Sequence, residues 1–163
     1  GGCGIDVFNE ELQKHYSRGS FGLTKRFYVG DKVMQTRNNY KKDVFNGDIG
    51  IISNIDYEDE TVTVQMDERE VVYEGSEDDE LVLAYAVSVH KYQGSECPCV
   101  IVPVHTSHFM LLTKNLLYTA VTRGKKLVIL IGIKKAVAMG VRNQNNDLRF
   151  TGLQASLSDN KAT

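Results

Sequence analysis

The chain has 163 residues, of which 42% are apolar, and its formal net charge is −2. This length fits one domain, or one domain with a small insert, and no stretch approaches the ~18 apolar residues that a membrane-spanning helix needs. Three cysteines argue against a disulfide framework and favour a reducing, cytoplasmic compartment, and the start at Gly1 without a methionine predicts a piece of a longer protein.

Residues 1–45 are expected to form a helix followed by a short strand. Apolar side chains recur at helical spacing between Asp6, which suits an N-cap, and Ser17. A short run at 31–36 predicts a strand, and an Asn-rich cluster at 38–40 has the composition of a turn. We treat residues 1–45 as the first part of a domain that resumes after an insert.

Residues 46–83 predict a small all-β insert. Apolar and polar residues alternate in four short runs, and acidic or glycine-containing breaks separate the runs. This pattern is typical of a small antiparallel barrel or meander. Because so short a segment buries little surface when it folds alone, we expect it to depend on a host domain.

Charge is distributed unevenly along the chain. Residues 43–80 hold 14 acidic residues and one basic residue, which gives a net charge of −13. The flanks are basic, with a net charge of +4 over 1–42 and +7 over 81–163. A polyanion such as nucleic acid is therefore expected to meet the flanks first, and the acidic middle is expected to be a solvated surface.

Residues 84–163 return to an alternation of strands and helices. Apolar runs predict strands and amphipathic runs predict helices, in the order strand 99–104, helix 109–122, strand 127–132, helix 134–141 and a last helix 148–157. Strands separated by helices imply a parallel sheet. The predicted fold class is α/β, with a parallel sheet and an inserted antiparallel β-barrel.

The stretch 86–103 is a polar turn that leads into an apolar strand, an arrangement in which α/β proteins place ligand chemistry. Glu96, just after Gly94, could accept a hydrogen bond from a ribose, or it could be a solvated acid. His90 alone is more often a structural histidine, but in this setting a polar contact to nucleic acid is credible. The candidate nucleic-acid contacts are Ser88, His90, Lys91 and Gln93.

Arg123 is the sharpest single candidate for phosphate chemistry. It follows the end of a predicted helix, beside Gly124. An arginine held in such a place can bind phosphate bidentately and stabilise the charge of a phosphoryl-transfer transition state. The alternative is a surface arginine in a basic cluster. Neither Gly-x-x-x-x-Gly-Lys-Ser/Thr nor Gly-x-Gly-x-x-Gly occurs in the chain, so it would supply only part of a nucleotide site.

The segment Cys97-Pro98-Cys99, together with His105 and His108, could bind a metal ion or could consist of ordinary packing residues. The spacing does not match the usual zinc spacings. Cys99 also starts an apolar run, where a free cysteine packs as a small hydrophobe. We therefore expect no metal site and no Cys–His nucleophile.

Two stretches resemble late motifs of superfamily 1 DNA helicases of the RecD-like branch, which includes the exodeoxyribonuclease V alpha subunit and TraA-type proteins. Residues 86–96, Ala-Val-Ser-Val-His-Lys-Tyr-Gln-Gly-Ser-Glu, resemble motif V. Residues 117–125, Leu-Tyr-Thr-Ala-Val-Thr-Arg-Gly-Lys, resemble motif VI. The segments 30–40 and 46–50, and Asn9-x-x-Leu-Gln13, are also similar to this branch. Tyr92 and Gly124 depart from the usual Ser and Ala.

The resemblance implies a fold and partners. Residues 1–45 and 84–163 would form a RecA-like domain (2A), and residues 46–83 an SH3-like barrel (2B) inserted in it. ATP with Mg²⁺ is the implied cofactor of the full-length protein, whose phosphate loop and metal ligands would lie outside this chain in a preceding domain (1A). The implied partners are single-stranded DNA, domain 1A and other exonuclease V subunits, with no membrane.

The resemblance also implies residue roles. Arg123 matches the arginine finger of motif VI. Gly94 and Glu96 match positions near the nucleotide, and Arg37 matches a motif IV arginine at the same site. Ser88 and His90 match positions that face single-stranded DNA or couple it to the nucleotide site. The alternative function is a non-catalytic module that binds single-stranded nucleic acid, and a further one is a structural domain whose acidic insert binds a basic partner.

Overall fold

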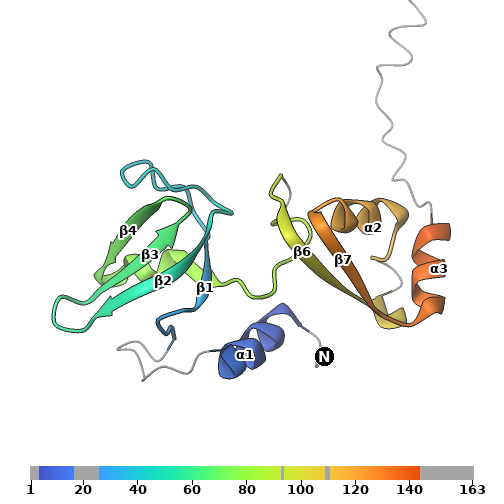
Figure 1. The fold of residues 1–163 in the computed structure, drawn as a ribbon, viewed down its shortest axis with the longest axis horizontal. Coiled ribbons are helices and arrows are strands. Elements are labelled where there is room, and N and C mark those ends of the chain that lie inside the picture. Colours follow the sequence, from blue (N-terminus) through green and yellow to red (C-terminus); the bar gives the residue numbers. More distant parts are fainter. Residues whose placement is uncertain (1–3, 17–25, 93, 109–110, 144–163) are drawn as a thin grey trace, which may run out of the picture. The chain divides into compact units, whose positions relative to one another are not determined.

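The computed structural model describes residues 4–16, 26–92, 94–108 and 111–143. Contacts divide the chain into two compact units, Gly1–Gln93 and Gly94–Thr163 (Figure 1). The boundary falls inside the stretch 86–103 that the sequence singled out. Each unit is described separately below.

In its described residues the first unit holds the α-helix α1, a 3-10 helix and a five-stranded antiparallel sheet of order β4-β3-β2-β1-β5. Its elements are α1 (Ile5–Tyr16), β1 (Lys32–Gln35), β2 (Ile49–Asp56), β3 (Thr61–Met66), β4 (Arg69–Glu74), the 3-10 helix η1 (Gly75–Glu80) and β5 (Leu81–Leu83). The predicted helix and the four runs of the insert are therefore confirmed as α1 and β2 to β5. Within the described residues β4 and β5 remain the edges, so the sheet is open and the expected barrel does not close.

Period-two alternation builds the core of this sheet. Val62, Val64 and Met66 of β3 are buried, whereas the intervening residues are partly exposed. Because successive side chains of a strand point to opposite faces, one face of β3 packs inward. The buried cluster is completed by residues of the other four strands and of the segments before and after β1: Phe27, Val33, Val44, Ile52, Val71, Tyr73 and Leu81.

The strand β1 lies elsewhere than the sequence suggested. We expected it in the RecA-like part, residues 1–45, but it pairs with β2 and with β5 inside the antiparallel sheet. Val33 stands opposite both Gly50 and Leu83. A four-residue strand carries no local signal of which sheet it joins, because strand pairing is decided by distant partners.

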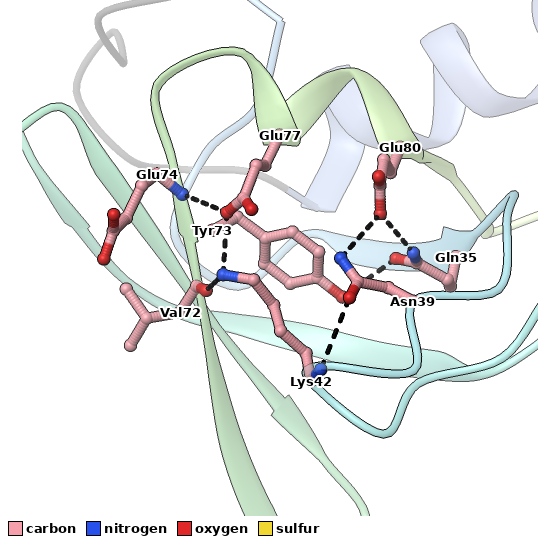
Figure 2. Close-up of polar contacts among 8 residues, drawn as sticks. All are labelled: Gln35, Asn39, Lys42, Val72, Tyr73, Glu74, Glu77 and Glu80. Carbon is pink, nitrogen blue, oxygen red and sulfur yellow. Dashed lines mark hydrogen bonds and ion pairs between the residues drawn. The ribbon is translucent and has the colours of Figure 1, made fainter.

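A polar network crosses the edge of the sheet core (Figure 2). The fully buried Tyr73 donates its hydroxyl hydrogen bond to Gln35 Oε1 at 2.9 Å, and Gln35 Nε2 donates to the Glu80 carboxylate at 2.7 Å. Asn39 Nδ2 donates to the same carboxylate at 3.4 Å. Lys42 Nζ lies 5.5 Å from the Tyr73 ring centroid and 2.7 Å from Glu77. Buried polar groups need such partners, because an unpaired one is costly.

The second unit pairs two parallel strands and carries helices between and after them. Its elements are β6 (Cys97–Val104), the 3-10 helix η2 (Thr106–His108), α2 (Lys114–Val121), β7 (Gly124–Gly132) and α3 (Lys134–Arg142). β6 pairs with β7 in parallel, from Cys97 opposite Gly124 to Val104 opposite Gly132. The predicted parallel α/β pattern is confirmed, and Val104, Leu112, Leu117 and Ala136 form its buried cluster.

Several boundaries in this unit differ from the prediction, and β6 already begins at Cys97 rather than at 99. The helix expected from residue 109 begins at Lys114, because the Thr113 side chain caps it by accepting a hydrogen bond from the Leu116 amide at 3.2 Å. The strand β7 begins at Gly124 rather than at 127. The last helix expected at 148–157 lies outside the described residues. In the part of the chain that is described, no helix has the length and apolarity to cross a membrane.

Burial raises the pKa of Tyr73 to about 12, and the nearby Glu80 carboxylate adds to the effect. A tyrosine in the unfolded chain titrates near 10. Because the folded state holds its proton to higher pH, this contribution to stability is complete below about pH 10 and is lost as pH rises toward about 12. Chemical denaturation at several pH values should show a steeper alkaline loss of stability in the wild type than in Tyr73→Phe.

At neutral pH, Tyr73→Phe should lower the free energy of unfolding by about 1–3 kcal/mol, since Gln35 Oε1 would be left buried without its donor. Identical alkaline profiles in the two proteins would contradict the assignment of the raised pKa to Tyr73.

Candidate nucleotide and nucleic-acid site

The junction between α2 and β7 fixes Arg123. Its amide donates to the Ala120 carbonyl at 3.3 Å, which continues the last turn of α2. Its guanidinium donates through Nε to the Thr119 carbonyl at 3.3 Å and through Nη1 to the Ser95 carbonyl at 3.1 Å. The half-buried side chain is therefore tied both to its own helix and to the segment that precedes β6.

Those bonds leave the charge of Arg123 uncompensated. The acceptors are main-chain carbonyls and, at 3.4 Å, the Thr122 hydroxyl, none of which is ionised. Among the described residues no carboxylate forms an ion pair with it. A guanidinium has five N–H donors in a planar fork, and these three bonds use three of them. Arg123 is thus oriented by neutral groups while it keeps donors and charge for an anion.

Parallel pairing of β6 and β7 brings the two helicase-like stretches together. The Cys97 amide donates to the Arg123 carbonyl at 2.9 Å, and Glu96 forms an ion pair with Lys125 at 3.0 Å. Both side chains of that pair are exposed, so the pair adds little stability. The ion pair instead marks where the two motifs meet. Glu96 and Arg123 are 27 residues apart in sequence, and both lie at the same end of the β6–β7 pair.

Gly94 lies just before this junction, at the first residue of the second unit. Its φ is +93°, a conformation that side chains with a Cβ rarely adopt. No atom lies within 4 Å of the position a Cβ would take. The glycine is therefore required for the direction of the backbone rather than for packing.

Ser88, His90 and Lys91 lie in the first unit, on the turn that closes it. The Ser88 hydroxyl accepts a hydrogen bond from the Lys91 amide at 3.2 Å, and the Ser88 carbonyl accepts one from the Tyr92 amide at 3.1 Å. These bonds fold residues 88–92 into one tight turn that leaves His90 and Lys91 exposed. Gln93, the fourth candidate, lies outside the described residues.

Two polar side chains of α1 hold the entry to this turn, and the sequence did not assign them a role. Asn9 is buried and makes two hydrogen bonds to Ala86, from Nδ2 to the carbonyl at 3.0 Å and from the amide to Oδ1 at 2.7 Å. Gln13 Nε2 donates at 2.5 Å to the buried Asp31, which also accepts from the Tyr85 hydroxyl at 2.9 Å. The only signal was the segment Asn9-x-x-Leu-Gln13 in the resemblance.

Arg37 is exposed on the bend after β1, in the first unit. The nucleotide-binding role implied for it stays a prediction. It comes from a different unit than Gly94, Glu96 and Arg123, which the second unit groups at the start of β6 and β7.

The candidate metal ligands Cys97 and Cys99 lie at one end of β6, and His105 lies at the other end. Cys97 and Cys99 begin the strand, and His105 follows its last residue, Val104. At about 3.3 Å per residue, eight strand residues separate the two ends by roughly 25 Å. The His105 ring instead pairs with the Ser107 hydroxyl at 2.9 Å. Within the described part of the chain, no group of three potential ligands could hold a metal ion.

Two family models match most of the described chain. The model of the ATP-dependent RecD-like DNA helicase SH3 domain matches residues 8–66, and the model of the UvrD-like helicase C-terminal domain matches residues 83–131. The chain belongs to the RecD-like DNA helicases. The SH3-like match includes β1, in agreement with the pairing of β1 inside the antiparallel sheet.

Curated relatives of this RecD-like chain are longer than it is. It is 34% identical over 156 residues to the ATP-dependent RecD2 DNA helicase of Deinococcus radiodurans, an alignment that covers 94% of this chain and 21% of that protein. It is 31% identical over 158 residues to the RecBCD enzyme subunit RecD of Mycolicibacterium smegmatis, with 96% and 27% covered. The chain thus spans about a quarter of the length of these relatives.

Solved structures share the fold. The chain superposes on Bacteroides Pif1 helicase in complex with ADP-AlF3 and ssDNA with a TM-score of 0.61 at 20% identity, covering 96% of this chain and 42% of that one. For Bacteroides Pif1 bound to ssDNA the TM-score is 0.54 at 24% identity, covering 83% and 34%. At these identities the likeness concerns the fold, which is the RecA-like α/β fold with an SH3-like insert.

Replacing Asn9 by alanine tests its hold on Ala86. Both hydrogen bonds would be lost, which leaves an amide and a carbonyl without their partners, so we expect a loss of about 1–3 kcal/mol of unfolding free energy. Amide exchange at Ala86 should accelerate. Asn54→Ala, at an exposed site on β2, serves as the matched control. Unchanged protection at Ala86 would contradict the anchoring role.

Proposed function

We propose that this RecD-like chain is the second half of an ATP-driven DNA motor: a RecA-like domain 2A, carried by residues 1–45 without β1 and by residues 84–163, and an SH3-like domain 2B inserted in it, whose sheet takes in β1 as well as residues 46–83. In the full-length protein it works against a preceding domain 1A that holds the phosphate loop and the Mg²⁺ ligands. The observation that carries the proposal is Arg123, which neutral acceptors orient and with which no carboxylate of the described residues forms an ion pair.

Arg123 acts as an arginine finger. It donates to the phosphate of ATP when domain 2A closes on domain 1A, and its charge stabilises the transition state of phosphoryl transfer. Because this contact exists only in the closed state, ATP binding favours closure and hydrolysis releases it. The bonds to Ser95 and Thr119 hold the fork in place, so little side-chain entropy is lost on closure.

Glu96 and Gly94 line the nucleotide side of the same junction, and Arg37 is the further candidate for a nucleotide contact. Glu96 accepts from the ribose, and its ion pair with Lys125 positions it beside Arg123. Mg²⁺ supplies charge neutralisation to the phosphates when ATP is bound. Since no group of potential ligands occurs among the described residues, this chain is not proposed to hold the ion.

The turn 88–92 carries the DNA side. His90 and Lys91 are exposed there and suit hydrogen bonds and ion pairs to the backbone of single-stranded DNA, with Ser88 in the same turn and Gln93 next in the sequence. The chain passes directly from this turn into Gly94 and Glu96. A change of the nucleotide state can therefore be coupled to the grip on DNA over a few residues, and repeated cycles move the motor along the strand.

The cellular setting follows from the same proposal. A cytoplasmic DNA helicase of this branch works in DNA repair, recombination or conjugation, and other exonuclease V subunits are its candidate partners. The RecD relative named above is a RecBCD enzyme subunit, which supports such an assembly for this chain.

Substitution of Arg123 in the full-length protein is the direct test. Arg123→Ala should lower DNA-stimulated ATP turnover by about 10³-fold or more and leave the affinity for single-stranded DNA unchanged, because the lost charge serves the transition state. Arg123→Gln keeps a donor for the Ser95 carbonyl but removes the charge, and it should be equally inactive. Lys126→Ala, on the exposed side of β7, is the matched control.

The result also distinguishes an ATP-driven motor from a module that only binds single-stranded nucleic acid. Full ATP turnover by Arg123→Gln would overturn the arginine finger and favour a module that only binds single-stranded nucleic acid.

The isolated 163-residue chain should not turn over ATP. Its sequence holds no phosphate loop, and Arg123 alone does not bind ATP in a reactive geometry. A coupled ATPase assay with and without single-stranded DNA is the measurement. Turnover that Arg123→Gln abolishes would show that the nucleotide site is complete within this chain, against the proposal.

A further inference from the structure

The loop between β1 and β2 presents an exposed pair of aromatic rings. We name residues 36–48 the aromatic loop. Tyr40 is 77% exposed and Phe45 42% exposed. Their ring centroids lie 6.1 Å apart with the planes at 78°, an edge-to-face pair. An aromatic pair in water forgoes the burial that usually stabilises it, so its exposure suggests a contact outside the described chain.

The loop is held firmly, so the ring pair is presented in a fixed place. Asn39 and Val44 exchange two backbone hydrogen bonds at 2.8 and 3.1 Å, and the Asn46 amide donates to the Asn38 side chain at 2.9 Å. Asn39 reaches the Glu80 carboxylate from one side of the loop (Figure 2). Lys42 reaches Glu77, and its amide donates to the Asn39 side chain at 3.3 Å.

The local charge differs from that of the surrounding acidic sheet. Within the loop, Lys42 is paired with Glu77 and Asp43 is paired with Arg69. Arg37 and Lys41 are exposed on either side of Tyr40 in sequence. The loop as a whole, residues 36–48, holds three basic and two acidic residues, a net charge of +1, although residues 43–80 carry −13. One of the two acids, Asp48, accepts a hydrogen bond from the Phe45 amide at 2.8 Å.

The base of the loop lies against the turn proposed to bind DNA. A Cβ placed on Gly47 would stand 3.7 Å from the Lys91 carbonyl oxygen, and Gly47 has a φ of +100°. Both segments belong to the first unit. Gly47, at the base of the loop and two residues from Phe45, thus lies beside the turn 88–92.

We infer that the aromatic loop is a base-stacking contact for single-stranded DNA. An unpaired base stacks on Tyr40, Phe45 supports the ring edge-on, and the exposed Lys41 contacts an adjacent phosphate. Rigid aromatic rings beside basic residues are the combination with which proteins bind single strands, since every base has a face that stacks. The inference rests on the proposed function, because it extends the DNA path from Ser88, His90 and Lys91.

Stacking and phosphate binding can be separated with abasic DNA. The full-length protein is titrated with a fluorescent oligo-dT and with an oligonucleotide of the same length whose bases are removed at successive central sites. Tyr40→Ala should weaken binding of oligo-dT about 5- to 100-fold, the effect of one stacked base. On the abasic strand the wild type and Tyr40→Ala should bind alike. Tyr40→Phe keeps the ring and should bind like the wild type.

Two matched variants complete the design. Tyr57→Ala removes an exposed tyrosine from the turn between β2 and β3 of the same sheet and should leave binding unchanged. Lys41→Ala should lower the slope of log affinity against log salt by about 0.7, the value for one lost phosphate contact to a single strand.

Equal affinity of Tyr40→Ala and the wild type for oligo-dT would overturn the inference and point to a protein partner at this loop. That result would leave the proposed function standing, because DNA-stimulated ATP turnover and its loss in Arg123→Gln are read separately. Absence of any binding to oligo-dT by the wild type would overturn both.

Discussion

Parallel pairing of β6 with β7 is the constraint on which the candidate site depends. The register sets Cys97 opposite Gly124, and the bond from the Cys97 amide to the Arg123 carbonyl closes that end of the pair. Everything that distinguishes the site follows from this one alignment: Ser95 reaches the Arg123 guanidinium, and Glu96 reaches Lys125. Shifting the register by one residue would reverse the face of each strand residue and separate these groups.

In the first unit, buried polar side chains hold the segment that leads to the candidate DNA-binding turn 88–92. Asp31 is fully buried and accepts hydrogen bonds from Gln13 of α1, from the Tyr28 amide and from the Tyr85 hydroxyl. A buried carboxylate is tolerated only when it is hydrogen-bonded in this way. These contacts connect α1 and the sheet to Tyr85, which directly precedes the stretch 86–103, and they therefore fix the start of the segment that contains the turn 88–92.

The sequence predicted those helices, strands and site residues that a local pattern of residues identifies. Alternation identified β2 to β5, because one face of each strand is buried, and the helicase-like stretches identified the residues at the junction of β6 and β7. It did not predict the place of β1, whose partners Leu83 and Gly50 lie far along the chain. The Asn9 contact to Ala86 spans 77 residues, and no periodicity signals a pair of hydrogen bonds over that distance. The helix start at Lys114 was missed because one capping side chain, Thr113, decides it.

The apolar surface of β6 and β7 supports the view that this chain is half of a motor. Parallel sheets are normally covered on both faces, and a sheet of two strands is marginal on its own. Here Ile101, Leu127 and Ile131 are exposed in the described structure. Such a surface requires further packing to be stable in water, and the relatives that match this chain are about four times as long. The proposed chemistry has the same character: Arg123 is positioned by neutral acceptors, and the phosphate that it would contact is proposed to be held by another part of the protein.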